Sequence, residues 1–516
     1  MIVNITSDNY LTIDIPVSSS IKIDEQFSQR EFEIFLERNL YNIMSLEIVK
    51  CNWLTSIPEL PNLTTLDCSY SEGLTSIPVL PNLITLDCRY CNGLTSIPLQ
   101  PNLTTLTCNG CPGLTCISVQ PNLTTLDCIG CEGLTHIPVQ PNLTTLDCNH
   151  CHRLTSVSVQ PNLTTLNCIE CRGLTEIPVQ PNLTTLTCAK CEKLTSIPVL
   201  PNLTTLNCTD CVGLTCIPAL PNLKTLSCNY CDGLTGIPVL SNLTTLNCTY
   251  CRGLKSIPVL PNLTTLYCNH CEGLTGIPVQ PNLTTLNCSD CYGLTEISTY
   301  PMLTILDCSQ CERLNIISAQ PNLRILYCYA CYELTGIPLL PNLTNLYCYN
   351  CEELTGIPVQ PNLTTLNCSD CRKLAEISTH PNLTTLYCNH CEGLKMIPAL
   401  PKLTILDCRY CEGLTGIPVL SNLTQLSYYA CPNLQIATIP IKFISNLDID
   451  TLIKCLEYNP YNIRDILGKP DLLGLTDTLN IIQEYLEYAE GEPLLELEGL
   501  LTENNIPLPI LVKPAK

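Results

Sequence analysis

The chain has 516 residues, a formal net charge of −21 and an aromatic content of only 5%. An acidic chain repels phosphate groups, so nucleic acid is excluded as the expected partner. There is no apolar run of 18 residues, and residues 1–11 lack the basic start and apolar centre of a signal peptide, so we expect a cytoplasmic protein that does not contact a membrane.

Residues 1–42 predict a small N-terminal cap. Apolar and polar residues alternate in LTIDIPVSSSIKID, which indicates one or two strands. Phe32, Phe35, Leu36 and Leu40 then follow helical spacing in FSQREFEIFLERNL. We expect this amphipathic helix to cover the open end of the domain that follows, because the first layer of a stacked array has no preceding neighbour.

From residue 43 to 437 the chain repeats one 20-residue unit without insertion or deletion, giving 20 units. Residues 61–80, PNLTTLDCSYSEGLTSIPVL, are one copy. The position of a residue in its unit, here called its place, is its number modulo 20, with multiples of 20 at place 20. Leu63, Leu66 and Leu74 mark the apolar places 3, 6 and 14. A constant period predicts one repeat solenoid instead of several globular domains.

Each unit reads as one coil of this solenoid. Leu66 and Cys68 alternate with Asp67, as a short strand with one buried face requires. Proline recurs at place 18 (Pro78) and place 1 (Pro81), where it fixes φ and blocks an α-helix. We therefore expect a strand on one side of every coil and an extended return on the other.

Cysteine fills two columns of the array. Of the 40 Cys, 18 occupy place 8 and 19 occupy place 11, so an ordinary unit contains C-x-x-C. That spacing is typical of zinc sites when further ligands accompany it. Place 8 is nevertheless Ile48 in the first unit and Tyr428 in the last, and place 11 is once Ser71. An isoleucine cannot hold a metal but fills the slot of a buried thiol, so we predict packed, reduced cysteines.

Two alternatives for these cysteines are regular disulfides within each unit and a metal or redox role. The chain has only six His, so a metal site would consist almost entirely of sulfur. Cys455 lies outside the array in LIKCLEY, with no His nearby. Its apolar helical spacing favours a core position over a nucleophile.

The repeat closely resembles the leucine-rich repeat, L-x-x-L-x-L-x-x-N/C-x-L, over about residues 43–437. Its short I-P-x-L-P return is similar to the 20-residue repeats of bacterial leucine-rich-repeat effectors. The motif PNLTTLxCxxC resembles leucine-rich-repeat proteins of giant amoeba viruses, and this resemblance would imply that the protein is located in the host cytoplasm. The resemblance implies a horseshoe with a concave parallel β-sheet and an extended convex side, to which the terminal segments are predicted to add small helical caps. Cys replaces the third Leu of the strand, and place 11 is Cys where the effectors carry Asn.

Strand alternation directs places 5 and 7 to the concave face, where a protein partner would be recognised. Place 5 is mostly Thr, whereas place 7 changes from acidic to amide to aromatic along the chain. Aromatic residues flanked by Asn and Asp favour protein recognition, although they also stabilise neighbouring strands by stacking. The candidate partner-binding residues are Asp67, Asp87, Asp127, Asp147, Asn167, Asn207, Asn247, Tyr267, Asn287, Tyr327, Tyr347 and Tyr387.

Residues 438–516 lose the period and predict a mainly helical end-piece, with helices over 448–458, 476–490 and 493–503. Some bacterial effectors with similar repeats carry a larger ubiquitin-ligase domain with a catalytic Cys. This tail is too short for such a domain, so no ligase function is assigned to Cys455.

No phosphate-binding loop, carboxylate pair or Ser/His/Asp arrangement stands out in the sequence. We therefore predict a non-enzymatic interaction scaffold with no cofactor and no metal, which binds a protein on its concave face. One alternative is a substrate-binding adaptor for a ubiquitin ligase or another host pathway, with a terminal segment docking the machinery. Another is a thiol-rich metal or redox protein. The sequence does not identify the partner or the oligomeric state.

Overall fold

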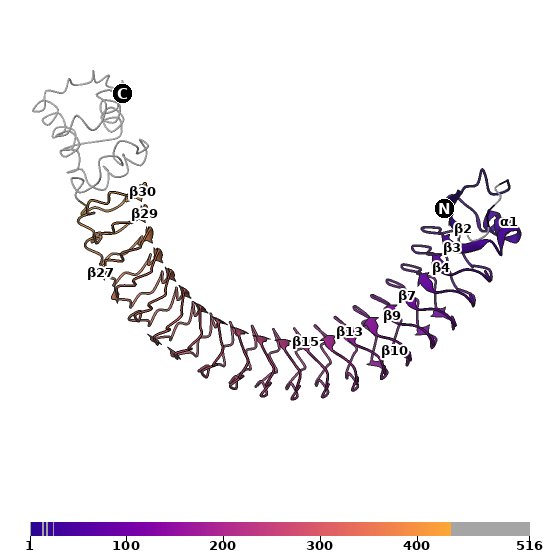
Figure 1. Ribbon diagram of the computed structural model, residues 1–516, viewed down its shortest axis with the longest axis horizontal. Coiled ribbons are helices and arrows are strands. Elements are labelled where there is room, and N and C mark those ends of the chain that lie inside the picture. The colour runs from indigo at the N-terminus through magenta and orange to yellow at the C-terminus, as the bar shows by residue number, and fades with distance from the viewer. Residues whose placement is uncertain (1, 13–14, 17–18, 24, 435–516) are drawn as a thin grey trace, which may run out of the picture. The chain divides into compact units, whose positions relative to one another are not determined.

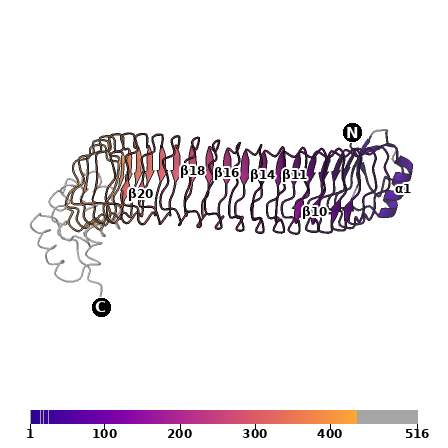
Figure 2. The same cartoon turned by 90° about the horizontal axis from the view of Figure 1, so that it is seen from below.

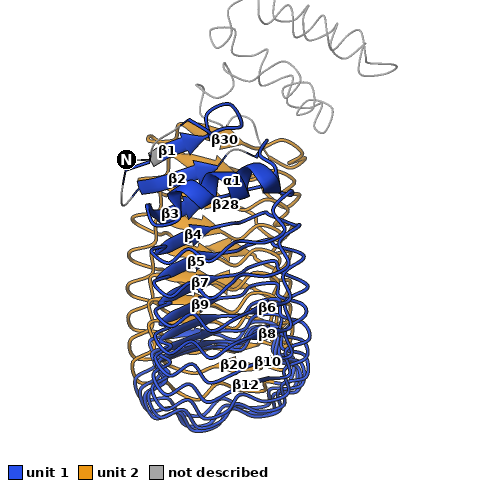
Figure 3. Cartoon of the chain, turned by 90° about the vertical axis from the view of Figure 1, so that its right-hand side faces the viewer, with its two compact units in different colours: residues 1–273 blue, residues 274–516 orange. Residues whose placement is uncertain are grey.

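A computed structural model describes residues 2–434 apart from 13–14, 17–18 and 24. The chain divides into two compact units, residues 1–273 (unit 1) and residues 274–516 (unit 2), which are coloured separately in Figure 3. The predicted C-terminal helices over 448–458, 476–490 and 493–503, together with Cys455, lie outside the described residues. Each of the two is a stack of short coils in which one strand of a parallel sheet recurs per repeat.

In unit 1 the main sheet runs along the chain in sequence order, and every pairing is parallel. Residues at the same place pair with one another, as Leu66 does with Leu86. Its strands are β1 (Ile2–Ile5), β2 (Ser19–Ile23), β3 (Ile43–Glu47), β4 (Thr65–Asp67), β5 (Thr85–Asp87), β7 (Thr105–Thr107), β9 (Thr125–Asp127), β11 (Thr145–Asp147), β13 (Thr165–Asn167), β14 (Thr185–Thr187), β15 (Thr205–Asn207), β16 (Thr225–Ser227), β17 (Thr245–Asn247) and β18 (Thr265–Tyr267).

Unit 2 follows the same rule, again with parallel strands paired in register. Its main-sheet strands are β19 (Thr285–Asn287), β21 (Ile305–Asp307), β23 (Ile325–Tyr327), β24 (Asn345–Tyr347), β26 (Thr365–Asn367), β28 (Thr385–Tyr387), β29 (Ile405–Asp407) and β30 (Gln425–Ser427). The predicted strand in each repeat is thereby confirmed.

The return side of the coils is extended, as predicted. Ile at place 17 is buried there while place 16 points outward, so the segment forms two-residue strands where neighbouring coils align. Figure 2 shows this second row of strands along the edge opposite the main sheet. The pairs are β6 (Ser96–Ile97) with β8 (Cys116–Ile117), β10 (His136–Ile137) with β12 (Ser156–Val157), β20 (Glu296–Ile297) with β22 (Ile316–Ile317), and β25 (Gly356–Ile357) with β27 (Glu376–Ile377).

The N-terminal cap contains the predicted helix, α1 (Gln29–Asn39), with Phe32, Phe35 and Leu36 buried. Ser28 begins it with a capping box, since its hydroxyl bonds the backbone N–H of Glu31 and the Glu31 carboxylate returns to the backbone of Ser28. Leu40 is not part of the helix but its C-cap, and it is only half-buried.

The stretch predicted to hold one or two strands, residues 11–24, contains β2 (Ser19–Ile23), and the prediction is confirmed to that extent. Leu11 and Thr12 lie in a turn, closed by the bond from the Thr12 N–H to the Asn9 carbonyl, and β1 precedes the predicted stretch. Because β1 pairs with β2 and β2 with β3, two strands extend the main sheet beyond the first repeat. The first layer is therefore covered by strands as well as by the helix.

Aromatic side chains close this end of the core. Trp53 of the first repeat packs on Phe27 and Phe32, with ring centroids 6.2 and 5.7 Å away, and its indole N–H donates to the Glu25 carbonyl. Tyr10 adds an edge contact to Phe27. Large rings fill the space that a neighbouring coil fills elsewhere.

Inside the array, the side chains at places 3, 6, 8, 11, 14 and 17 are buried in nearly every coil. Place 20 is buried as well, and several copies carry Gln there instead of Leu. These glutamines bond between coils: Gln120 accepts from the Gln100 N–H at 2.7 Å and donates to the Pro98 carbonyl at 2.7 Å. A buried amide is tolerated because both its oxygen and its nitrogen are paired.

Candidate functional site

The sequence predicts that a protein partner binds the side chains of places 5 and 7 on the main-sheet strands. These side chains are here called the strand face. In every repeat but the last, where Leu426 is half-exposed, the middle residue of the strand is buried, and the residues on either side are nearly all half-exposed or exposed. Among the candidate residues Tyr267 is exposed and all the others are half-exposed. Within unit 1 the strands lie on the inner side of the curve (Figure 1). The predicted orientation of this column is confirmed, whereas partner binding by it stays a prediction.

The candidate carboxylates are brought together in two groups. Asp67 pairs in register with Asp87, and Asp127 with Asp147. Most of them are partly engaged within the chain. Arg89 forms an ion pair with Asp87 at 2.7 Å, and one oxygen of Asp67 accepts from the Ser69 N–H at 3.0 Å.

Asp147 is half-buried among neighbouring coils. Burial raises its pKa, and the neighbouring charge of Asp127 acts in the same direction. Hydrogen bonds from the Asn149 N–H at 3.2 Å and the Asn167 amide at 3.1 Å oppose this shift. The acidic column of unit 1 is thus a row of half-exposed carboxylates, of which Asp147 is partly desolvated.

The amide residues of place 7 have a structural role that sequence reasoning missed. The Oδ1 atoms of Asn207, Asn247 and Asn287 accept from the backbone N–H two residues later, at 3.0 to 3.3 Å. Such a bond closes an Asx-turn directly after the strand. The short polar residues of place 7 therefore shape the turn as well as the face. The recurrence of Asp or Asn before Cys was the available signal.

Four tyrosines on adjacent coils of unit 2 form the main aromatic feature, here called the tyrosine patch: Tyr327, Tyr329, Tyr347 and Tyr349. Tyr327 stacks on Tyr347 with ring centroids 4.8 Å apart, and Tyr329 stacks on Tyr349 at 4.5 Å. All four are half-exposed. Burial and the neighbouring ring raise the pKa of Tyr327 and likewise that of Tyr349, so the hydroxyls stay protonated donors.

The remaining candidate tyrosine of unit 2 is isolated from this patch. Tyr387 pairs in register with Asn367 on one side and Asp407 on the other. Sequence reasoning missed Tyr329 and Tyr349 because they lie at place 9, just past the strand. Their spacing of 20 residues was the signal that could have identified them.

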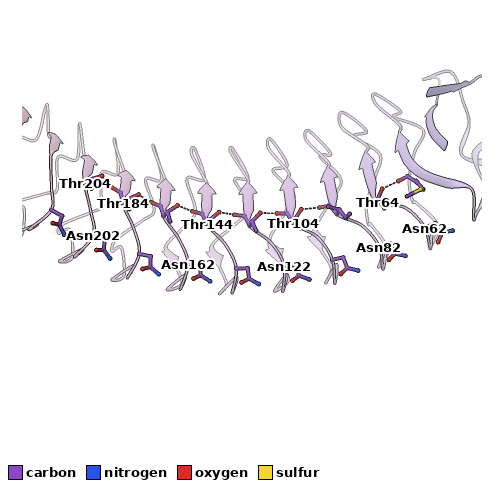
Figure 4. A pocket seen from close by; sticks show the side chains of 18 of the residues that line it. Asn62, Thr64, Asn82, Thr104, Asn122, Thr144, Asn162, Thr184, Asn202 and Thr204 are labelled. Atoms are coloured by element: carbon purple, nitrogen blue, oxygen red, sulfur yellow. Dashed lines mark hydrogen bonds between the residues drawn. The ribbon is translucent and has the colours of Figure 1, made fainter. Parts of the chain in front are cut away.

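A second surface follows from the Asn-Leu-Thr of places 2 to 4, which lies immediately before each strand. The Nδ2 atom of each Asn donates to the carbonyl at place 1 of the preceding coil, as Asn122 does to Pro101 at 2.8 Å. The hydroxyl of each Thr donates to the carbonyl at place 4 of the preceding coil, as Thr124 does to Thr104 at 3.0 Å. Figure 4 shows the resulting row of Thr hydroxyls, with a parallel row of Asn amides beside it.

In unit 1 these two rows border an open trough of about 1710 Å³ that runs from Tyr41 to Asn242. Here it is called the Asn/Thr trough. Lys224 is the one charged residue in its lining. Unit 2 has a shorter counterpart of about 520 Å³, whose lining includes Arg324 and Lys402.

The two cysteine columns are buried, as predicted, but their roles differ. At place 11 the thiol donates to the carbonyl at place 8 of the preceding coil, as Cys91 does to Cys68 at 3.1 Å. At place 8 the thiol mainly fills space, and the bond to a backbone oxygen is longer where it forms, as from Cys68 to Asp87 at 3.5 Å. Place 11, which is Asn in the bacterial effectors, is Cys in this chain, and the thiol still supplies a hydrogen-bond donor to the turn.

In the turn after each strand, the residue at place 10 has a left-handed backbone conformation, for example Tyr90 at φ 56° and His270 at φ 56°. A side chain there costs about 1–2 kcal/mol of backbone strain. Stacking between coils offsets this cost, since Tyr230, Tyr250 and His270 stack at 4.6 and 4.0 Å. The tripeptide Asn-His-Cys, which recurs at residues 149–151, 269–271 and 389–391, belongs to this turn.

Within residues 2–434 as described, no three His, Cys, Asp or Glu side chains are grouped so that they could hold a metal ion. The same residues contain no helix long and apolar enough to cross a bilayer.

No family model matches the sequence, and no curated protein is similar to it. Among solved structures, the chain is similar to a leucine-rich repeat protein from Bacteroides ovatus, with 17% identity, 55% of this chain and 81% of that chain covered, and a TM-score of 0.35. It is also similar to CroV588, described as a novel circular leucine-rich-repeat protein, with 12% identity, 80% and 68% of the two chains covered, and a TM-score of 0.21. By its repeat, its parallel sheet and its extended return segments, the chain folds as a leucine-rich-repeat solenoid.

Proposed function

We propose that the protein is a non-enzymatic scaffold that binds a protein partner on its strand face and on the place-9 tyrosines just past it. The fold is one typical of protein-interaction scaffolds. The observation that carries the proposal is the tyrosine patch, in which two stacked pairs of half-exposed rings lie on adjacent coils. Stacking fixes the rings before a partner arrives, so binding them costs little side-chain entropy. Tyr is also among the residue types enriched at interface hot spots.

The division of the repeat into fixed and variable places supports the same proposal. Leu at places 3, 6 and 14 recurs with few exceptions, while place 7 changes from Asp to Asn to Tyr along the array. The buried places hold one coil against the next, and this frees the outward place to vary without loss of packing. A surface that varies on a constant framework suits recognition better than it suits stability alone.

No observation in the described residues favours the adaptor alternative, which depends on segments such as 438–516. The thiol-rich alternative fits poorly with cysteines that are buried and bonded to backbone carbonyls. We place the scaffold in a reducing cytoplasm, where such thiols stay reduced.

Affinity capture with the full chain tests the proposal. The double substitution Tyr347→Ala with Tyr349→Ala is expected to lose the captured partner and to shift the thermal midpoint little, because both rings are half-exposed. Tyr90→Ala removes one ring of the Tyr70–Tyr90 stack in unit 1 and is the matched control, which should retain the partner. Equal capture by all three chains would contradict the proposal.

A further inference from the structure

We infer that the Asn/Thr trough of unit 1 binds a lysine-rich segment of the partner protein. The inference rests on the proposed function, because it assumes a protein partner. It concerns a surface beside the strand face, formed by places 2 and 4 instead of 5 and 7. It is based on the hydrogen-bonding groups of the trough that are not used in bonds between neighbouring coils.

The Thr row has already used its donors. Each hydroxyl hydrogen is directed at a carbonyl of the preceding coil, as Thr144 bonds Thr124 and Thr164 bonds Thr144, both at 3.0 Å. The backbone N–H of the same residues bonds the same carbonyls, for example Thr144 to Thr124 at 2.9 Å. Only the lone pairs of the Thr oxygens remain for a ligand.

The Asn row is committed in the same direction. Nδ2 of Asn142 donates to Pro121 at 2.7 Å and Nδ2 of Asn162 donates to Pro141 at 2.8 Å, which fixes each amide plane. Among the described residues, no donor is directed at the Oδ1 atoms of Asn142 and Asn162. The trough therefore presents two parallel rows of oriented acceptor oxygens, and a ligand that supplies donors is complementary to it.

Charge selects a cationic donor. The place-7 column on the same coils is mostly acidic from Glu47 to Asp147, with Thr107 as the one neutral residue. Lys22 and Arg89 form ion pairs with Glu47 and Asp87, and the other acidic members of this stretch are Asp67, Asp127 and Asp147. Lys224 is the one cation in the lining and lies near the far end of the trough. The chain as a whole carries −21. An acceptor-lined surface in a negative field attracts ammonium groups and repels carboxylates and phosphates.

Unit 2 contains an example of a cation that donates a hydrogen bond to one of these Asn oxygens. There Lys402 occupies place 2, and its ammonium donates to Oδ1 of Asn382 at 2.7 Å. This is the bond we assign to the partner's lysines in unit 1. The acceptors are single oxygens in separate rows and not paired carboxylates, so three ammonium donors on a flexible stem suit them better than the rigid fork of Arg.

The length of the trough favours a polypeptide segment over a small amine. Neighbouring coils lie about 4.8 Å apart, so the coils from Asn62 to Asn242 span on the order of 45 Å. Several lysines of one segment can bind along it at once. Residues 435–516 of the chain itself are an unsuitable occupant, because they carry a net charge of −7.

The test uses the full chain and a fluorescent oligolysine peptide, with binding measured by anisotropy. Asn142→Lys places a cation in the trough at a place where Lys402 shows that Lys is accommodated. We expect it to weaken peptide binding by about tenfold. Asn362→Lys makes the same change in the shorter trough of unit 2 and should leave the affinity unchanged. Thermal midpoints confirm that both variants fold.

Unchanged affinity in Asn142→Lys would overturn the inference, and so would an equal loss in both variants, which would indicate attraction by net charge alone. Spermine that binds as tightly as the peptide would also overturn it, because a small amine would then suffice. The Tyr347→Ala with Tyr349→Ala chain separates the two proposals. If it loses the captured partner while the wild type fails to bind oligolysine, the strand-face proposal stands and the trough assignment fails.

Discussion

The hydroxyl of Ser71 donates a hydrogen bond of 3.0 Å to the carbonyl oxygen of Ile48. In the next coil, the thiol of Cys91 makes the same bond to the carbonyl of Cys68 at 3.1 Å. The first of these pairs contains no cysteine, yet its geometry is that of the second. Place 11 therefore requires a donor and place 8 requires apolar volume, although cysteine fills both.

This difference between places 8 and 11 predicts opposite responses to the same substitutions within one central repeat. Cys228→Ser puts a hydroxyl into the apolar slot of place 8 and should cost about 1–3 kcal/mol of unfolding free energy. Cys228→Val should be tolerated, because Ile48 fills the same place. Urea midpoints of the full chain measure both changes. A Cys228→Ser midpoint equal to that of the wild type would contradict burial in an apolar slot.

At place 11 the order should reverse. Cys231→Ser keeps the donor to the Cys208 carbonyl and should shift the urea midpoint little. Cys231→Val leaves that carbonyl without its donor and should cost about 1–3 kcal/mol. Matching midpoints for the two Cys231 variants would show that the bond does not stabilise the turn.

Thiol reactivity should separate the cysteines by exposure. Cys116 and Cys216 are exposed on the return side, and the other described cysteines are buried. The hydrogen bond with Cys251 and burial both raise the pKa of Cys228, which lowers its thiolate fraction further. Brief iodoacetamide labelling of the native chain, followed by peptide mapping, should modify Cys116 and Cys216 first. Labelling of Cys228 at the same rate would be incompatible with a buried column.

His380 makes the stability pH-dependent. It replaces a buried Gln at place 20, its Nδ1 accepts from the Gln360 N–H at 3.1 Å, and its Nε2 has no partner in the described structure. Burial lowers its pKa to about 4, from an ordinary value of 6.5. Between those values the unfolded chain binds a proton that the folded chain does not. Stability is therefore complete above about pH 6.5 and falls toward pH 4, by at most about 3 kcal/mol.

The substitution His380→Gln isolates this effect. It restores the amide found at place 20 in the neighbouring coil and removes the titrating ring. The difference in urea midpoint between pH 7.5 and pH 5 should be smaller in this variant than in the wild type. An unchanged difference would assign the pH dependence to other groups.

The single tryptophan reports on the N-terminal cap. Because Trp53 packs on Phe27 and Phe32, its fluorescence follows unfolding of this end, whereas far-ultraviolet circular dichroism follows the array. Ser28→Ala removes the side-chain acceptor that begins α1 and should cost the cap about 1 kcal/mol. We expect the fluorescence transition to shift more than the dichroism transition. Equal shifts would mean that the cap and the array unfold as one unit.

Much of the fold was predictable because one period specifies it. Leu66 in every copy must face the same interior, so register and strand position follow from counting. The cap has no period, and although β2 lies in the predicted stretch, β1 was not predicted. Ile2–Ile5 forms β1 because β2 offers it an edge, and a tertiary pairing of this kind leaves little trace in the local pattern.

The candidate site was predictable in orientation but not in chemistry. Alternation directs Asp147 and Tyr347 outward, and they do lie on the strand face. The sequence could not show that Asn207 closes a turn, or that the donors of Asn142 and Thr144 are used by the preceding coil. The bonds of Asn142 and Thr144 join residues about 20 apart in the chain, and they depend on how closely the coils stack. The bond of Asn207 is local to its turn.

Site-specific photo-crosslinking tests the central claim, recognition of a protein by the strand face, most directly. A photoreactive phenylalanine would replace Tyr347 on β24 in one chain and the exposed Val359 of the return segment in another. The account predicts a crosslinked partner from position 347 and none from position 359. A partner captured from position 359 alone, or equally from both positions, would contradict it.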